Sequence, residues 1–476
     1  MNRQKPVPER EKTENEKIEK EKEKILRRTQ GSAISGERSE RNMIMRKTKF
    51  VTAAICAVML SAMTAFHAYC DTSAASASEL TSGTETYVSE TVQEVADTSA
   101  AETIYNVSGT DTASTSGSSA LDTSDLFSSR DLEQTADLTG AENITVSDGE
   151  TYTVSKEGVY VVTGSASNAQ IVVSAGDEDK VQLVLDSVSI TNESTPCIYV
   201  QNADKVFVTT TDSENTLTVS GAFTADGDTN TDAVIFSRDD LVINGTGTLN
   251  IVSSENGISG KDDLKVTGGT INITCTADAL EANESILVAD GTISIKSDKD
   301  GLHAENDEDN TVGYIYIADG TITIEAGDDA IHATTIAQVD GGTIDLTGAE
   351  GIEGTYIQIN GGEISIAAAD DGINAGQKSN FATPTIEVNG GELTIVMGSG
   401  DTDGVDSNGN LYLNGGTLNI TAQSPFDYDG TARNNGATLI VNGSETDSIT
   451  NQMMGGGGMG GGMRGGMGGH GGHGGF

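Results

Sequence analysis

One repeated pattern decides the fold, and the copy that begins at residue 291 reads Gly291-Thr-Ile-Ser-Ile…Asp300-Gly-Leu-His303. The other copies read Gly320-Thr-Ile-Thr-Ile…Asp329-Ala-Ile-His332, Gly342-Thr-Ile-Asp-Leu…Glu350-Gly-Ile-Glu353, Gly362-Glu-Ile-Ser-Ile…Asp371-Gly-Ile-Asn374 and Gly391-Glu-Leu-Thr-Ile…Asp403-Gly-Val-Asp406. Each copy opens on glycine and a short apolar alternation. Each closes on an acidic residue before a Gly-Ile or similar pair. Alternation at period two predicts β-strands.

The spacing of these copies predicts a solenoid. The opening glycine falls at positions 247, 269, 291, 320, 342, 362, 391 and 416, so the steps lie near 22 residues. Each unit holds three apolar pulses, for example 321–324, 330–332 and 336–339. Three short strands per unit, with no helical period, are typical of one coil of a parallel β-helix. We predict an all-β, right-handed parallel β-helix with coils of about 22 residues, stacked about 4.8 Å apart.

The composition changes along the chain predict five regions. Residues 1–44 are a charged N-terminal extension, in which Met43, or Met45 just after it, is a better start than Met1. A basic stretch and an apolar run then predict a signal peptide over 45–74. Residues 75–137 read as a Ser/Thr-rich disordered linker, 138–450 as the β-helix domain, and 451–476 as a Gly/Met/His-rich tail. We therefore expect a secreted, cell-surface-associated monomer with no membrane span in its mature chain.

The charge balance limits the partners of the chain. Of its 476 residues, the first 50 contain 15 of the 27 Lys and Arg but only 9 of the 72 Asp and Glu. The remainder therefore carries a strong excess of acid. Such a surface repels nucleic acid and favours cations and cation-bridged anionic partners.

Stacking the coils aligns the acidic position into a column. Carboxylates at this spacing repel one another unless water or cations screen them. Calcium takes about 6–8 oxygen ligands in forgiving geometry, so it suits such a column. The predicted calcium ligands are Asp298, Asp300, Asp328, Asp329, Glu350, Asp370, Asp371, Asp401 and Asp403. The alternative is a solvated acidic turn that keeps the solenoid soluble.

A second column lies three residues further along each copy and is predicted to face outward. Together with a lysine beside the acidic column, it supplies the predicted ligand-binding residues His303, His332, Glu353, Asn374, Asp406 and Lys299. These side chains would line a groove and form hydrogen bonds with a ligand. A transition-metal pair or a proton-transfer role for the two histidines is the alternative. Insertions at 305–310 and 377–381 indicate the same working face.

Catalysis is the less favoured interpretation. A polyuronate lyase needs calcium on the substrate and a Lys or Arg base beside the sugar. The repeat offers Lys296 and Lys299, and no arginine lies between Arg238 and Arg433. A glycosidase needs one defined pair of carboxylates, which this surface does not single out.

Four segments resemble a known family: 234–249 (VIFSRDDLVINGTGTL), 260–271 (GKDDLKVTGGTI), 400–409 (GDTDGVDSNG) and 424–430 (SPFDYDG). This family comprises secreted bacterial carbohydrate-binding proteins with a pectate-lyase-like parallel β-helix. The resemblance implies binding of polygalacturonate and cellulose, with calcium in the coils and without established lyase activity. Because Trp is absent, the sequence favours cation-bridged acidic polysaccharide over stacking on cellulose. We predict a non-catalytic binder of acidic plant polysaccharide such as pectin. The alternatives are a calcium-dependent polyuronate lyase and a structural adhesin.

Overall fold

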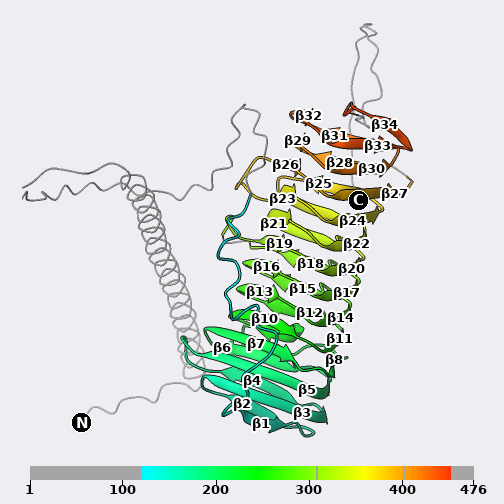
Figure 1. Cartoon of the computed structure of the whole chain (residues 1–476). Helices are drawn as coiled ribbons and strands as arrows, with labels where there is room; N and C mark the ends of the chain where they lie inside the picture. The colour runs from blue at the N-terminus through cyan, green and yellow to red at the C-terminus, as the bar shows by residue number, and fades with distance from the viewer. Residues whose placement is uncertain (1–119, 307–308, 400–401, 452–476) are drawn as a thin grey trace, which may run out of the picture. The chain divides into compact units, whose positions relative to one another are not determined.

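The computed structural model describes residues 120–306, 309–399 and 402–451, and these form an all-β solenoid of parallel strands (Figure 1). Among the named strands, every pairing is parallel except that of β33 with β34. Within the described ranges there is no helix long and apolar enough to span a bilayer. The predicted extension, signal peptide, tail and most of the linker lie outside the described residues.

The strands stack into three columns. The first column contains β1 (Glu142–Thr145), β3 (Gly158–Ser167), β5 (Lys180–Asn192), β7 (Lys205–Thr210), β10 (Asp240–Gly245), β13 (Asp263–Val266), β16 (Ser285–Val288), β19 (Tyr314–Ile317), β21 (Ile331–Val339), β23 (Ile352–Ile359), β26 (Thr385–Val388), β29 (Asn410–Leu413) and β32 (Ala432–Asn434). Of the long strands β5, β21 and β23, only one part belongs to this column.

The second column begins with the later part of β3, which pairs with the later part of β5. It continues with β8 (Glu214–Val219), β11 (Thr248–Ser253), β14 (Thr270–Cys275), β17 (Thr292–Ser297), β20 (Thr321–Glu325), β22 (Thr343–Gly348), β24 (Glu363–Ala368), β27 (Glu392–Met397), β30 (Thr417–Thr421) and β33 (Thr438–Val441), after which β34 (Ser444–Thr446) turns back.

The third column positions the candidate site. It contains β2 (Thr151–Val154), β4 (Gln170–Ser174), β6 (Ile198–Asn202), β9 (Ala233–Ser237), β12 (Asn256–Gly260), β15 (Leu280–Ala282), β18 (Leu302–Ala304), the first parts of β21 and β23, β25 (Asp371–Ala375), β28 (Asp403–Ser407) and β31 (Ser424–Tyr428).

The alternation in the sequence becomes an inside and an outside in each strand. In β17, exposed and buried residues alternate from Thr292 to Ser297. The register places Ile293 beside Ile271 on one side and Ile322 on the other, so apolar side chains stack coil after coil. These positions are about 1% exposed and belong to one continuous core. Burial of this stack, at roughly 25 cal/mol per Å² of apolar surface, is the main stabilising term.

The opening glycine of each copy bends the chain at the same place. Gly320 has φ of 122° and Gly342 has φ of 98°, a region that side chains disfavour. A Cβ at Gly342 would lie 2.9 Å from the carbonyl oxygen of Gly320 in the preceding coil. The recurring glycines therefore satisfy both a backbone conformation and close stacking.

The end of the predicted linker differs from expectation, because residues 120–134 pack along the first column (Figure 1). Leu121 is buried, and the Asp131 carboxylate is within 3.2 Å of Lys205 Nζ and 3.6 Å of Lys265 Nζ. Gln358 accepts a hydrogen bond from the backbone N–H of Ala120. Low local hydrophobicity hid these contacts, since they depend on buried polar partners far along the chain.

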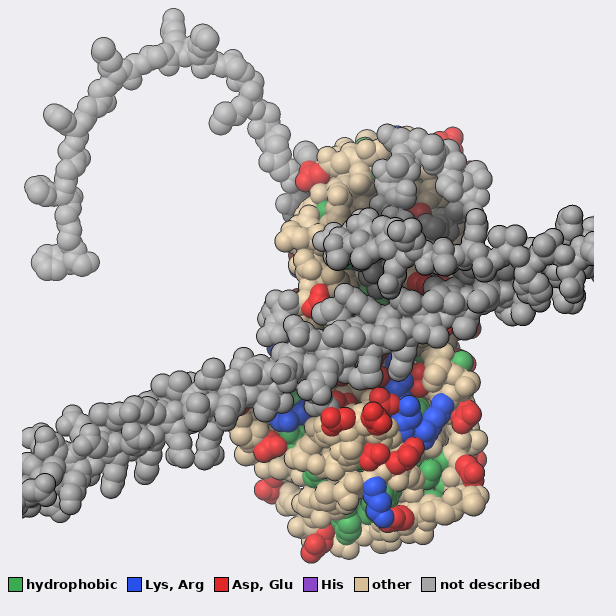
Figure 2. All heavy atoms as spheres, turned by 90° about the vertical axis from the view of Figure 1, so that its left-hand side faces the viewer, with side chains coloured by type: hydrophobic (Ala, Val, Ile, Leu, Met, Phe, Trp, Pro, Cys, Tyr) green, Lys and Arg blue, Asp and Glu red, His purple; other side chains and the backbone are tan. Residues whose placement is uncertain are grey.

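Acidic and basic side chains lie next to one another on the face shown in Figure 2. Along the first column, Lys205 contacts both Asp131 and Asp240. This face thus offsets part of the acidic charge within itself, unlike parts of the third column described below.

Candidate functional site

The acidic column lies at the turn that enters the third column of strands. Asp278 precedes β15, Asp300 precedes β18 and Asp329 precedes β21. Further along, Glu350 precedes β23, and Asp371 begins β25. The stacking predicted from the spacing is therefore present, and the register pairs Asp371 directly with Asp403 of β28.

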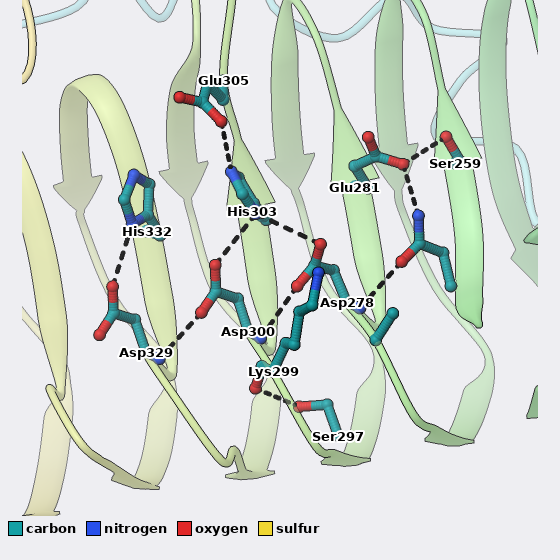
Figure 3. A network of polar contacts seen from close by, with 12 residues as sticks. Ser259, Asp278, Glu281, Ser297, Lys299, Asp300, His303, Glu305, Asp329 and His332 are labelled. Carbon is teal, nitrogen blue, oxygen red and sulfur yellow. Dashed lines mark hydrogen bonds and ion pairs between the residues drawn. The ribbon is translucent and has the colours of Figure 1, made fainter. Parts of the chain in front are cut away.

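Hydrogen bonds to the backbone connect these side chains from coil to coil (Figure 3). Asn256 Oδ1 accepts from Asp278 N at 2.9 Å, Asp278 Oδ1 from Asp300 N at 3.0 Å, Asp300 Oδ1 from Asp329 N at 2.9 Å, and Asp371 Oδ1 from Asp403 N at 3.1 Å. Each carboxylate thus satisfies a backbone N–H of the next coil. One oxygen of each of these carboxylates has a structural role.

Burial separates the predicted ligands into two groups. Asp300 and Asp329 are 6% and 7% exposed, so the alternative of a solvated acidic turn is wrong for them. Asp298, Asp328 and Asp370 are exposed beside the ladder and do not join its backbone hydrogen bonds. The predicted ligand Asp401 lies outside the described residues.

Histidines compensate the charge in the first half of the column. His303 Nδ1 lies 3.0 Å from Asp300 Oδ2 and 3.4 Å from Asp278 Oδ2. Burial opposes protonation, but the two carboxylates outweigh it and raise the pKa of His303 to about 11. The ring also lies 4.9 Å, between centroids, from that of His332 in the next coil.

His332 belongs to a second charge-compensated group. Its Nδ1 lies 3.0 Å from Asp329 Oδ2 and 2.8 Å from Glu353 Oε2, while Lys378 pairs with the other Glu353 oxygen. Burial alone would raise the pKa of Glu353, but His332 and Lys378 lower it to about 2. Glu353 is only 4% exposed, so it does not line the open groove predicted for the outward column.

Further along the column, no cation among the described residues is a main influence on Asp371 or Asp406. Burial, followed by neighbouring carboxylates, raises the pKa of Asp371 to about 6 and that of Asp406 to about 7. Asp406 pairs in register with Asp427 of β31, which extends the acidic cluster by one coil. The potential metal ligands of Asp371, Asp406 and Asp427 are all carboxylate oxygens.

Asn374 lies in this second half of the column. Its amide nitrogen donates to both oxygens of Glu350, at 3.2 and 3.1 Å, while its buried Oδ1 has no hydrogen-bond partner. Burial and nearby carboxylates also raise the pKa of Glu350 to about 8. An orphaned amide oxygen beside carboxylates that resist ionisation fits a calcium site, because calcium takes carbonyl and carboxylate oxygens.

The two insertions meet beside this column, as expected of a working face. Ser379 donates a hydrogen bond to the backbone oxygen of Asn310 at 2.8 Å. Glu305 of the first insertion contacts His303, and Lys378 of the second contacts Glu353.

Sequence reasoning missed Glu305, Lys378 and Asp427 as site residues. Position within the insertions could have identified the first two. Asp427 could have been found by extending the outward column, since Phe426 occupies the inward position before it.

The lysines beside the repeat are poorly suited to act as a base. Lys296 forms an exposed ion pair with Glu325 at 3.1 Å. Burial would lower the pKa of Lys378, but Glu353 raises it above its usual value. Lys299 is exposed beside Asp278 and Asp300, as Figure 3 shows. A lyase base must lose its proton, and the Glu353 carboxylate favours the ammonium form of Lys378.

Comparison with known proteins was made for sequence and for structure. A family model described as "Carbohydrate-binding domain-containing protein" matches residues 148–402 and 348–453. A protein of that description from Acetivibrio thermocellus is 38% identical over 119 residues, which are 24% of this chain and 42% of the relative. The chain thus matches less than half the length of that relative. A solved structure of the polysaccharide lyase-like protein from C. thermocellum, a gadolinium derivative, is 30% identical with a TM-score of 0.41, and the match covers 47% of this chain and 93% of that one.

Proposed function

The chain belongs to the family of carbohydrate-binding domain-containing proteins, and from this premise we propose that it holds acidic polysaccharide of the polygalacturonate class through calcium, without catalysis. The observation that carries the proposal is the oxygen cluster of Asp371 and Asp406 with the unpartnered Oδ1 of Asn374, which Asp403 and Asp427 extend in register. A calcium ion there would stabilise the charged carboxylates of Asp371 and Asp406, whose pKa values burial and neighbouring carboxylates raise. It would also leave coordination positions for uronate oxygens.

Charge supports a bridging ion over direct contact. Both partners are anionic, since this chain carries a formal charge of −45 and polyuronates carry a carboxylate on each residue. Attraction therefore requires cations between them. The sheltered side chains of the first half already have histidine partners, so the proposal places calcium in the second half.

The finer features of the fold and location belong to the same proposal. We take the solenoid as right-handed, because crossover connections between parallel strands nearly always have that hand. The basic and apolar stretch over 46–66 supports export, which would bring the binding surface to plant material outside the cell.

The test is retention of the protein on insoluble polygalacturonate, with calcium and with a chelator. We expect retention with calcium and its loss in chelator. Asp371→Asn combined with Asp406→Asn should also abolish retention. Asp298→Asn combined with Asp328→Asn removes the same number of charges from exposed positions and serves as the matched control.

Three results would count against the proposal. Retention that persists unchanged in chelator contradicts the calcium bridge. Ultraviolet absorbance from unsaturated uronate products would favour the lyase. No retention on any acidic or neutral glycan would leave a structural adhesin.

A further inference from the structure

Asp278, Asp300 and His303 form a compact group of mixed ligands in the first half of the column. One oxygen of each carboxylate and one ring nitrogen all lie within 4.8 Å of one another. Asp278 and Asp300 are more than nine-tenths buried, at 7% and 6% exposed. Unlike the second half of the column, this group offers nitrogen as well as oxygen.

His303 Nδ1 faces two carboxylates. The atom is fully buried and forms ion pairs with Asp300 Oδ2, 3.0 Å away, and with Asp278 Oδ2, 3.4 Å away, without the geometry of a regular hydrogen bond. Ligands about 2.0–2.1 Å from a tetrahedral ion lie roughly 3.3 Å from one another. The two distances from Nδ1 are therefore those expected between ligands of one shared ion, and the two carboxylates each place an oxygen within 4.8 Å of the other.

The other ring nitrogen determines what Nδ1 can do. His303 Nε2 lies 3.2 Å from Glu305 Oε2. A carboxylate only accepts, so Nε2 carries the proton. A metal ion that displaces the proton from Nδ1 would then meet the Nδ1 lone pair beside the two aspartate Oδ2 atoms. A carboxylate that holds the distal N–H of a histidine in this way is the usual support for a metal-ligating imidazole.

The backbone orients the two aspartates toward the same point (Figure 3). Asp278 Oδ1 accepts from Asp300 N, and Asp300 Oδ1 accepts from Asp329 N. The two Oδ2 atoms are thereby directed at His303. The site is prearranged by coil stacking, so binding an ion requires little reorganisation.

We propose that Asp278, Asp300 and His303 bind one Zn²⁺ ion, with Glu305 as the positioning residue and solvent completing the coordination. Imidazole with carboxylate suits Zn²⁺, whereas calcium prefers oxygen ligands alone. The inference goes beyond polysaccharide binding and does not depend on it.

The neighbouring histidine supplies an internal comparison. His332 Nδ1 makes a hydrogen bond of 3.0 Å to Asp329 Oδ2, and it also contacts Glu353, which Lys378 neutralises further. Its ring nitrogen already has a satisfied partner. Asp300, Asp329 and His332 also offer ligand atoms within 4.8 Å of one another, so His332, one coil away, is the matched comparison that tests whether the hydrogen bond of its Nδ1 excludes an ion.

The experiment uses the full chain carrying His67→Gln, His470→Gln and His473→Gln, so that His303 and His332 are the only two of its five histidines that remain. Zn²⁺ is titrated by calorimetry, and Co²⁺ is titrated by its visible absorption, which is intense in four-coordinate sites. We expect one Zn²⁺ per chain. His303→Gln should weaken binding at least about 100-fold and remove the Co²⁺ bands. Glu305→Gln should weaken binding about 10-fold or more, the usual effect of losing such a support.

His332→Gln should change Zn²⁺ affinity by less than about threefold, and circular dichroism should show that every variant remains folded. Absence of Zn²⁺ binding would overturn the inference, as would equal losses in His303→Gln and His332→Gln. Unchanged affinity in both His303→Gln and Glu305→Gln would likewise overturn it. Retention of His303→Gln on polygalacturonate separates this result from the proposed function, which involves the other half of the column.

Discussion

Removal of the Asp300 carboxylate should expose one backbone N–H in the next coil. Asp300 Oδ1 accepts the hydrogen bond of Asp329 N at 2.9 Å, and both residues are buried. In Asp300→Ala the N–H loses its acceptor without gaining solvent. Asp300→Asn retains an amide oxygen in the same place, so it removes the charge but keeps the hydrogen bond.

The size of the effect follows from the cost of a buried, unsatisfied N–H. That cost is about 1–3 kcal/mol, which corresponds to roughly 5- to 150-fold in an opening equilibrium. Amide hydrogen exchange measures this equilibrium residue by residue. We therefore expect the Asp329 amide to exchange roughly 5- to 150-fold faster in Asp300→Ala than in Asp300→Asn.

The assay is hydrogen–deuterium exchange with fragmentation to single residues, in chelator so that no ion contributes. The Asp403 amide, which donates to Asp371 Oδ1 at 3.1 Å, is the control and should exchange alike in both variants. Equal exchange of the Asp329 amide in the two variants would refute the ladder as a stabilising feature.

Three further predictions concern other parts of the fold. Burial and neighbouring carboxylates raise the pKa of Asp262 to about 8, so its stabilising protonated form is lost as the pH rises through that value. Asp262→Asn should therefore be neutral near pH 4 and stabilising by about 1–2 kcal/mol above pH 8, as measured by denaturant unfolding at both pH values. A Cβ at Gly372 would lie 2.4 Å from the carbonyl oxygen of Gly404, so Gly372→Ala should destabilise by about 1–3 kcal/mol, and an unchanged melting temperature would contradict this packing. Burial raises the pKa of both Cys197 and Cys275 to about 12, so alkylation at pH 8 followed by peptide mass analysis should modify neither thiol until the chain is unfolded.

The stacking could be predicted from the sequence because, in a parallel solenoid, the length of the repeat determines which residues of adjacent coils pair. The step from Gly269 to Gly291 already aligns Ile271 with Ile293, and the structure pairs them. The same spacing brought His303 beside His332, which the register confirms. Because apolar and polar residues alternate in every copy and the copies have nearly equal length, the inward apolar residues of one coil stack on those of the next.

The accessibility of the predicted site residues could not be derived from spacing. Glu353 and Asn374 hold equivalent positions in successive coils, yet one is bound by His332 and Lys378 while the other has a buried amide oxygen without a partner. The difference arises from His332 and from Lys378, which the insertion brings within ion-pair distance of Glu353. The spacing of the repeat identifies equivalent positions in successive coils, but it does not show which side chains pair with each of them.

The sequence by itself determined the parallel stack, its inward apolar columns and the alignment of acidic residues on one turn, because these follow from covalent spacing and hydrophobic burial. Only the tertiary structure decided how those acids are charged. Side chains from neighbouring coils and from the insertions neutralise carboxylates in the first half of the column. In the second half, the Asp406 carboxylate lies near other carboxylates, which raise its pKa. Electrostatic energy depends on distance and burial in space, and the chain order does not contain either.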